Sequence, residues 1–250
     1  MKKHTTRSIV KLKQENKKLQ MLTCYDFQTA QILNESKLDL ILVGDSLGNV
    51  VLGYNSTIHV TVNDMITFGA AVKRGAPDKF VVIDLPFGSN RTIETGLEDS
   101  VEIFRLTGCE AIKIEGAHTN NLELIKRLVQ IGIPVMGHIG LMPQSVHAQG
   151  GFYKHGKSDT DAKRIFNEAK TLEHAGCFSI VLECVEEKLS YEISQSLSIP
   201  TIGIGSGKDT DGQVLVINDL FGMTQHYPSF AKPMANFHQI KKEIVDIYLG

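Results

Sequence analysis

Residues 38–45 read LDLILVGD, a short apolar run that stops at a glycine and an aspartate. Such a run is typical of a buried strand when turn residues follow it. Seven further runs have the same character, at 19–25, 80–85, 111–115, 134–139, 179–184, 200–204 and 214–217. The sequence therefore predicts eight short strands.

Longer segments with helical periodicity separate these strands. They cover 62–74, 95–106, 121–131, 159–175 and 187–197. Several end at a Gly or Pro that stops a helix, as in RGAP at 74–77. Eight strands alternating with helices predict an α/β fold, a (β/α)8 TIM barrel, in preference to an open sheet.

The whole chain, 1–250, is expected to form a single barrel domain, since barrels of this length commonly do so. The basic segment 1–20 is predicted to form an extra N-terminal helix with Ile9 and Leu12 on its inner face, and a further helix is expected at the C-terminus.

The composition favours small-molecule chemistry. Lys and Arg number 26 against 28 Asp and Glu, giving a net charge of −2, so no basic field is present to hold nucleic acid or a membrane surface. No apolar run approaches the roughly 18–20 residues of a membrane span. The scattered cysteines signal neither zinc nor a disulfide framework and suit a cytoplasmic location: Cys24, Cys109, Cys177 and Cys184.

Polar residues collect near the ends of the predicted strands, where barrel enzymes carry their chemistry. They are Asp45, Asp84, Lys113, Glu115, His138 and Glu183. Because side chains alternate along a strand, Lys113 and Glu115 should both point inward, while Ile112 and Ile114 point towards the helices.

Buried charges are costly unless they are paired or bound to a metal. Two or three carboxylates with water and a chelating substrate suit Mg²⁺. Lys113 could balance the charge of a substrate carboxylate. Glu183, at the end of an otherwise apolar strand, is the residue hardest to explain structurally.

Each of the other residues also has a structural explanation. Asp45 could cap the segment after its strand, and Asp84 could form a turn before Leu-Pro. Lys113 and Glu115 could be a simple ion pair, and His138 a hydrogen-bonded core histidine. The shared placement favours a functional site over any of these explanations taken singly.

A glycine run follows the seventh predicted strand. Gly203, Gly205 and Gly207 form G-x-G-x-G, which does not match the dinucleotide fingerprint G-x-G-x-x-G. A phosphate site and close packing at the barrel rim both remain open.

Several motifs resemble one known family over about residues 9–232. They are VGDSLG, DLPF, IKIEG, GHIGLMPQS, GGFYKHGK, LECV and IPTIGIGSG, and together they resemble the ketopantoate hydroxymethyltransferases. The resemblance implies a Mg²⁺-dependent barrel enzyme that transfers a hydroxymethyl unit from 5,10-methylenetetrahydrofolate to 3-methyl-2-oxobutanoate. The product would be 2-dehydropantoate, for pantothenate and coenzyme A synthesis. A cytoplasmic homo-oligomer, typically a decamer, is also implied.

The resemblance assigns roles residue by residue. Asp45 and Asp84 match the metal-binding carboxylates, with Glu115 joined to the metal directly or through water. The substrate-binding positions are matched by Asp45, Ser46, Asp84 and Lys113. Glu183 matches the proton acceptor, and His138 is expected to support these residues without contacting substrate.

The mechanism expected from these roles is proton removal by Glu183 at C3 of the oxoacid, with Mg²⁺ stabilising the enolate. A Schiff base on Lys113 is a competing mechanism. Two other functions remain as alternatives: a Mg²⁺-dependent aldolase or lyase acting on another 2-oxoacid, and a barrel that binds an oxoacid without catalysis.

Overall fold

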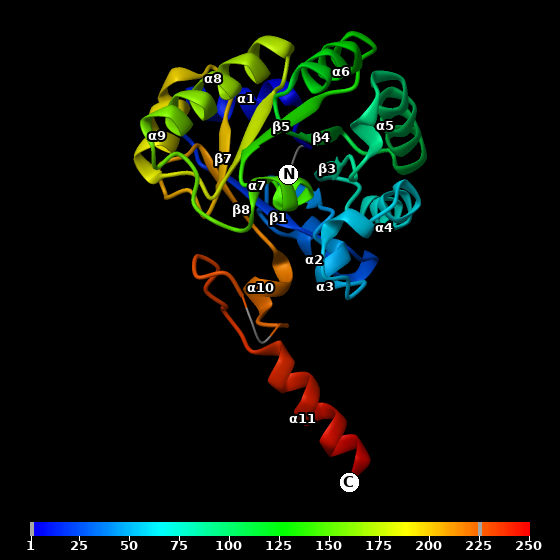
Figure 1. The fold of residues 1–250 in the computed structure, drawn as a ribbon. Coiled ribbons are helices and arrows are strands. Elements are labelled where there is room, and N and C mark those ends of the chain that lie inside the picture. The colour runs from blue at the N-terminus through cyan, green and yellow to red at the C-terminus, as the bar shows by residue number, and fades with distance from the viewer. Residues whose placement is uncertain (1–2, 225–226) are drawn as a thin grey trace.

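A closed barrel of parallel strands forms the centre of the molecule (Figure 1). The computed structural model describes residues 3–224 and 227–250. Within these residues eight strands pair in chain order, and the last pairs with the first. They are β1 Leu19–Thr23, β2 Leu40–Val43, β3 Phe80–Asp84, β4 Ala111–Glu115, β5 Val135–Gly140, β6 Ser179–Glu183, β7 Thr201–Ile204 and β8 Gly212–Leu215. The predicted (β/α)8 barrel is confirmed.

Helices surround the barrel (Figure 1). The longer ones are α2 Phe27–Glu35, α4 Val62–Gly75, α5 Ile93–Thr107, α6 Thr119–Gln130, α8 Asp159–Ala175 and α9 Glu187–Ser196. Local signals fix their ends. In α8, the Ser158 side chain accepts a hydrogen bond from the Asp161 N–H, and Gly176 ends the helix at a φ of 103°.

Short helical segments lie in the connections between strands and helices. They are α3 Leu47–Val50, η1 Thr57–His59, η2 Ser89–Arg91, η3 Pro143–Ser145, α7 Val146–Gln149 and α10 Ile217–Phe221. Two long connections, after β2 and after β5, contain α3 with η1 and η3 with α7. They provide walls above the barrel end.

Alternation along the strands divides the apolar core into two clusters. The outer cluster, between strands and helices, includes Ile41, Val43, Ile83, Ile112, Ile114 and Leu182. The inner cluster fills the barrel and includes Leu19, Met21, Leu40, Val82, Met136, Val181 and Ile202. Ile112 and Ile114 thus face the helices, as predicted, which directs Lys113 and Glu115 into the barrel.

The predicted N-terminal helix closes one end of the barrel. This helix, α1 Thr6–Gln14, begins with a capping box between Thr5 and Ser8. Ile9 is fully buried in the inner cluster, and Leu12 packs against that cluster. The polar strand ends therefore lie at the opposite end of the barrel.

The eighth strand begins two residues earlier than the sequence predicts. It spans Gly212–Leu215, and Ile217 instead starts α10. Gly212 pairs with Leu19, and a Cβ on Gly212 would lie 2.7 Å from the Leu19 Cβ. A glycine is a poor strand former, but the close approach of β1 requires one here.

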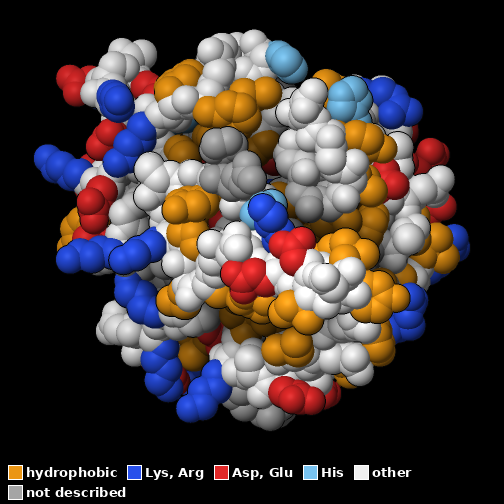
Figure 2. All heavy atoms as spheres, turned by 90° about the horizontal axis from the view of Figure 1, so that it is seen from below, with side chains coloured by type: hydrophobic (Ala, Val, Ile, Leu, Met, Phe, Trp, Pro, Cys, Tyr) orange, Lys and Arg blue, Asp and Glu red, His pale blue; other side chains and the backbone are white. Residues whose placement is uncertain are grey.

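The C-terminal helix α11, Phe237–Leu249, extends away from the barrel (Figure 1). None of its residues is buried. Figure 2 views the molecule from the side towards which α11 projects and shows hydrophobic side chains scattered among charged ones. In the described part of the chain, no helix combines the length and apolarity needed to span a membrane.

Because Ile9 of α1 is buried in the inner cluster, shortening its side chain should strongly destabilise the protein. Ile9→Ala should lower the free energy of unfolding by about 2–4 kcal/mol, because it leaves a cavity in the inner cluster. Ile32→Ala is the matched control, since Ile32 lies on α2 and is 67% exposed; it should change stability by about 0.5 kcal/mol or less. Urea unfolding measures both, and equal losses would contradict the seating of α1.

Candidate functional site

Six charged or titratable side chains meet at the end of the barrel opposite α1. They are Asp45, Asp84, Lys113, Glu115, His138 and Glu183. All are buried except Glu183, whose side chain is 17% exposed. They come from β3, β4, β5 and β6 and from the residue two positions beyond β2. The structure therefore brings together every charged residue that the sequence placed at a strand end.

Lys113 lies at the centre of this group. Its Nζ is 3.0 Å from Asp84 Oδ1, 4.0 Å from Glu115 Oε1 and 3.0 Å from His138 Nδ1. Burial works to lower the pKa of Lys113, but the charges of Asp84 and Glu115 outweigh burial and raise it above its ordinary value. Lys113 is thus an ammonium ion.

Asp45 and Asp84 lie next to each other at the polar end of the barrel. The Asp45 N–H donates to Asp84 Oδ2 at 3.0 Å. Burial, with the neighbouring charge of Asp84, raises the pKa of Asp45 to about 7. Asp45 does not cap α3, because the N-cap residue of that helix is Ser46 and no side chain bonds to the helix start.

His138 connects Lys113 to Glu183. An ammonium only donates, so His138 Nδ1 accepts from Lys113 and the ring proton resides on Nε2. Nε2 lies 2.9 Å from the Leu141 carbonyl oxygen and 3.2 Å from Glu183 Oε2. Burial and the charge of Lys113 lower the pKa of His138, which keeps the ring neutral.

Glu115 faces protein donors with both of its oxygens. Oε1 lies 4.0 Å from the Lys113 ammonium, and Oε2 accepts from the Gln144 N–H at 3.2 Å. Burial, with the charge of Asp45, raises the pKa of Glu115 well above its ordinary value. This carboxyl group is therefore less available to a metal than the Asp45–Asp84 pair.

The group carries an excess of acidic side chains that fits a cation. Four carboxyl groups, on Asp45, Asp84, Glu115 and Glu183, face the single ammonium of Lys113. In residues 3–224 and 227–250, no three His, Cys, Asp or Glu side chains already form a metal-binding group. The Asp45–Asp84 pair nevertheless matches Mg²⁺, which takes one or two protein carboxylates and completes its shell with water and substrate.

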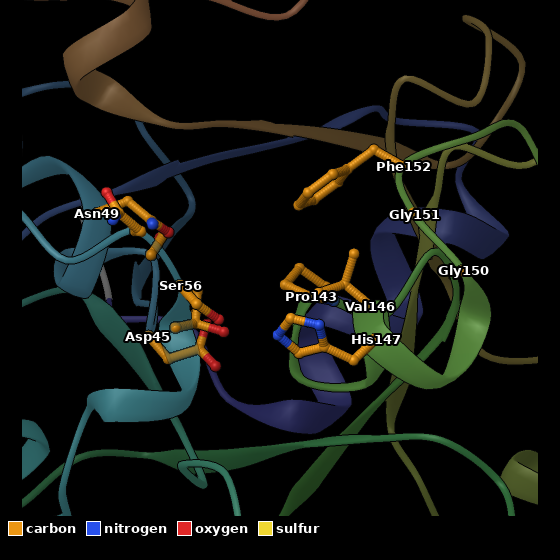
Figure 3. Close-up of a pocket in the computed structure, with 12 residues that line it drawn as sticks. Asp45, Asn49, Ser56, Pro143, Val146, His147, Gly150, Gly151 and Phe152 are labelled. Carbon is orange, nitrogen blue, oxygen red and sulfur yellow. The ribbon is translucent and has the colours of Figure 1, made fainter.

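Ser46 lies at the edge of this group. Its Oγ is 2.8 Å from the hydroxyl of Tyr25, which follows β1. Asp45 and Ser46 also line a cavity of about 480 Å³. Figure 3 shows Asp45, Asn49 and Ser56 on one side of this cavity and Pro143, Val146, His147 and Phe152 on the other.

Sequence reasoning missed two polar residues of the site. Gln144 Nε2 donates to Asp45 Oδ2 at 2.8 Å and to the Leu85 carbonyl at 3.0 Å. Tyr25 is buried beside Ser46, and burial raises its pKa above the ordinary value. Gln144 lies in the motif GHIGLMPQS and Tyr25 just past β1, but neither is charged, so the search for charges at strand ends passed over both.

The glycine run after β7 is packed against neighbouring residues. A Cβ on Gly203 would meet Thr210 Oγ1 at 2.7 Å, and one on Gly207 would meet Glu187 Cγ at 2.3 Å. Gly205 has a φ of +64° and lies against the ring of Phe230. These contacts support close packing at the barrel rim over a phosphate site.

Comparison with known proteins gives a match over nearly the whole chain. The family model described as ketopantoate hydroxymethyltransferase matches residues 3–249. A 3-methyl-2-oxobutanoate hydroxymethyltransferase from Leptospira interrogans is 48% identical over 238 residues, covering 94% of this chain and 90% of that protein. One of the same name from Coxiella burnetii is 47% identical, with the same coverage.

Solved structures share the fold at low sequence identity. A phosphonopyruvate hydrolase in complex with oxalate and Mg²⁺ superposes with a TM-score of 0.64 at 8% identity, covering 98% of both chains. A 2,3-dimethylmalate lyase, described as a member of the PEP mutase/isocitrate lyase superfamily, gives 0.63 at 15% identity and the same coverage. At these identities the likeness shows the shared barrel.

The raised pKa of Asp45 predicts that replacing its carboxylate by a neutral amide stabilises the protein in a pH-dependent way. Its pKa rises from 3.8 to about 7 on folding, so the metal-free protein loses stability as pH rises from about 4 to 7, where only the unfolded chain ionises, and the loss is complete above 7. In the presence of a chelator, Asp45→Asn should therefore melt about 2–4 °C above wild type at pH 8 and close to it at pH 4.

Calorimetry at the two pH values measures this difference. Asp209→Asn, at an exposed position, is the control and should show no such dependence. A melting temperature of Asp45→Asn below wild type at pH 8 would contradict the buried repulsion.

Proposed function

Since the chain belongs to the ketopantoate hydroxymethyltransferase family, we propose that it transfers a hydroxymethyl unit from 5,10-methylenetetrahydrofolate to 3-methyl-2-oxobutanoate. The product is 2-dehydropantoate, a precursor of pantothenate and coenzyme A. The observation that carries the proposal is the family match over residues 3–249. The buried ammonium and the acidic pair at one barrel end support it, because a 2-oxoacid carries a carboxylate that an ammonium can balance and can chelate a divalent metal.

Asp45 and Asp84 are the residues that would hold Mg²⁺. The two residues are adjacent, and burial together with the charge of Asp84 raises the pKa of Asp45, an effect that a bound cation would oppose. Glu115 would join through a water molecule, since both of its oxygens already face protein donors, the Lys113 ammonium and the Gln144 N–H. Bound Mg²⁺ supplies a Lewis acid for the ketone and carboxylate oxygens of the oxoacid.

Lys113 and Ser46 would orient the oxoacid. Lys113 is kept as an ammonium by the carboxylates around it, so it can balance the substrate carboxylate. The same protonation opposes a Schiff base, which requires a free amine. The Ser46 hydroxyl is positioned by Tyr25 and can bond to a substrate oxygen.

Glu183 is the proposed base. It removes the proton from C3 of the oxoacid, and the electron pair left at C3 forms the new bond to the one-carbon unit. Both C–N bonds that hold this carbon to the folate break, and water supplies the oxygen of the hydroxymethyl group. The C3 proton and one proton of water end on the two nitrogens of the departing tetrahydrofolate, and the other proton of water stays on the new hydroxyl. The neutral His138 faces Glu183 Oε2 with its Nε2–H and so holds the carboxylate in place.

A cytoplasmic homo-oligomer, with a decamer as the expected assembly, completes the proposal. The four cysteines are all free, which suits a reducing compartment. Helix α11 exposes a set of large apolar side chains that a neighbouring copy would cover: Ile240, Ile244, Ile247 and Tyr248.

Removing the base should stop proton exchange but leave binding intact. In heavy water, wild type should exchange the C3 proton of 3-methyl-2-oxobutanoate without folate. Glu183→Gln should lose this exchange by about 10²–10⁴-fold, since general bases contribute on that order. NMR follows the exchange, and Glu186→Gln, three residues away on the surface side, is the control. Exchange at the wild-type rate in Glu183→Gln would reject the assigned base.

Turnover should require the oxoacid, methylenetetrahydrofolate and Mg²⁺ together. Asp84→Asn and Asp45→Asn should each weaken Mg²⁺ binding measured by calorimetry, because each removes a charged ligand. Asp159→Asn, on α8, should not. Unchanged Mg²⁺ affinity in both site variants would reject the metal site. Carbon–carbon bond cleavage of a 2-oxoacid without folate would instead indicate a lyase.

A further inference from the structure

The 480 Å³ cavity beside Asp45 and Ser46 is larger than a small branched oxoacid needs. Its size falls in the range of roughly 300–1,000 Å³ that holds cofactor-sized ligands. Because it shares Asp45 and Ser46 with the oxoacid site, a second molecule bound there would touch the first. A bond-forming reaction requires this contact, with reacting atoms about 3–3.5 Å apart.

One wall of the cavity presents an exposed aromatic ring. Phe152 is 75% exposed, although a free phenyl ring in water is unfavourable. In Figure 3 the ring projects into the cavity, above Pro143 and Val146. Phe152 and Pro143 together offer flat apolar surfaces to a planar ring.

The opposite wall presents a polar group that is free to bind a ligand. The Asn55 side-chain amide is exposed, lines the cavity and makes no hydrogen bond to any residue in the described part of the chain. Thr57 also lines the cavity, but its Oγ1 is buried, so Thr57 shapes the wall and Asn55 is the residue that can reach a ligand.

We propose that this cavity binds the pterin ring of the folate co-substrate, stacked on Phe152 and hydrogen-bonded by Asn55. The pyrimidine half of a pterin is planar and carries N–H donors beside a carbonyl acceptor on one edge. An asparagine amide offers the complementary acceptor and donor. The pterin thereby brings its one-carbon unit next to the oxoacid.

This inference rests on the proposed function, but binding can be measured without turnover. The chain contains no Trp, so Phe152→Trp introduces a single indole into the proposed stack. Tetrahydrofolate should quench its fluorescence saturably. Tyr191→Trp, on α9 and half exposed, is the matched control. Its fluorescence should fall only by the amount that absorption of light by tetrahydrofolate accounts for. No saturable quenching in Phe152→Trp, or equal quenching in both, would overturn the site.

Steady-state kinetics then show whether Phe152 affects the folate substrate, the oxoacid or both. Phe152→Ala should raise the KM for methylenetetrahydrofolate about 10-fold, the usual cost of losing one aromatic stack. The KM for the oxoacid and the folate-free exchange at C3 should stay at wild-type values. Phe152→Trp should keep a KM near wild type, and Tyr191→Ala should change nothing.

These experiments distinguish failure of the proposed pterin site from failure of the proposed reaction. An unchanged folate KM in Phe152→Ala, or a parallel loss of C3 exchange, would overturn the pterin site. If wild type neither exchanges C3 nor transfers the one-carbon unit, the proposed reaction fails, and the fluorescence titration still decides whether a pterin binds.

Discussion

The ion pair between Lys113 and Asp84 organises the polar end of the barrel. Strand register brings it about, because Lys113 is the paired neighbour of Asp84 across β3 and β4. One strand further on, Glu115 pairs with His138 across β4 and β5. The closed barrel fixes these registers, and the registers decide which side chains of the site come into contact.

Burying so many charges has a cost that the rest of the fold must offset. The inner cluster and α1 fill the other end of the barrel with apolar side chains, so the polar end need not contribute to the core. At the polar end, burial and the mutual repulsion of the acidic groups raise the pKa values of Asp45 and Glu115. Strongly shifted pKa values of this kind are typical of functional sites.

Much of this arrangement can be predicted from the sequence. Short apolar runs and strict alternation locate seven strands closely and direct Lys113 and Glu115 inward. The start of β8 could not be predicted, because Gly212 belongs to the strand through its pairing with Leu19 and Ile202, which lie far away in the chain or on another strand. Gln144 and Tyr25 were missed for a similar reason: their roles depend on neighbours far away in the chain, such as Asp45 and Ser46.

The strands supply the charged residues of the site, and the loops supply the walls of its cavity. The groups assigned to oxoacid binding and proton removal, Lys113, His138 and Glu183, lie on strands whose positions the barrel holds rigidly. The cavity walls come from the connections after β2 and β5, which can vary in length and sequence without disturbing the strand registers. A barrel that fixes the oxoacid chemistry can therefore acquire a second substrate through its loops alone. The charged residues on the strands determine which reaction is possible, and the connections after β2 and β5 determine which second substrate can bind.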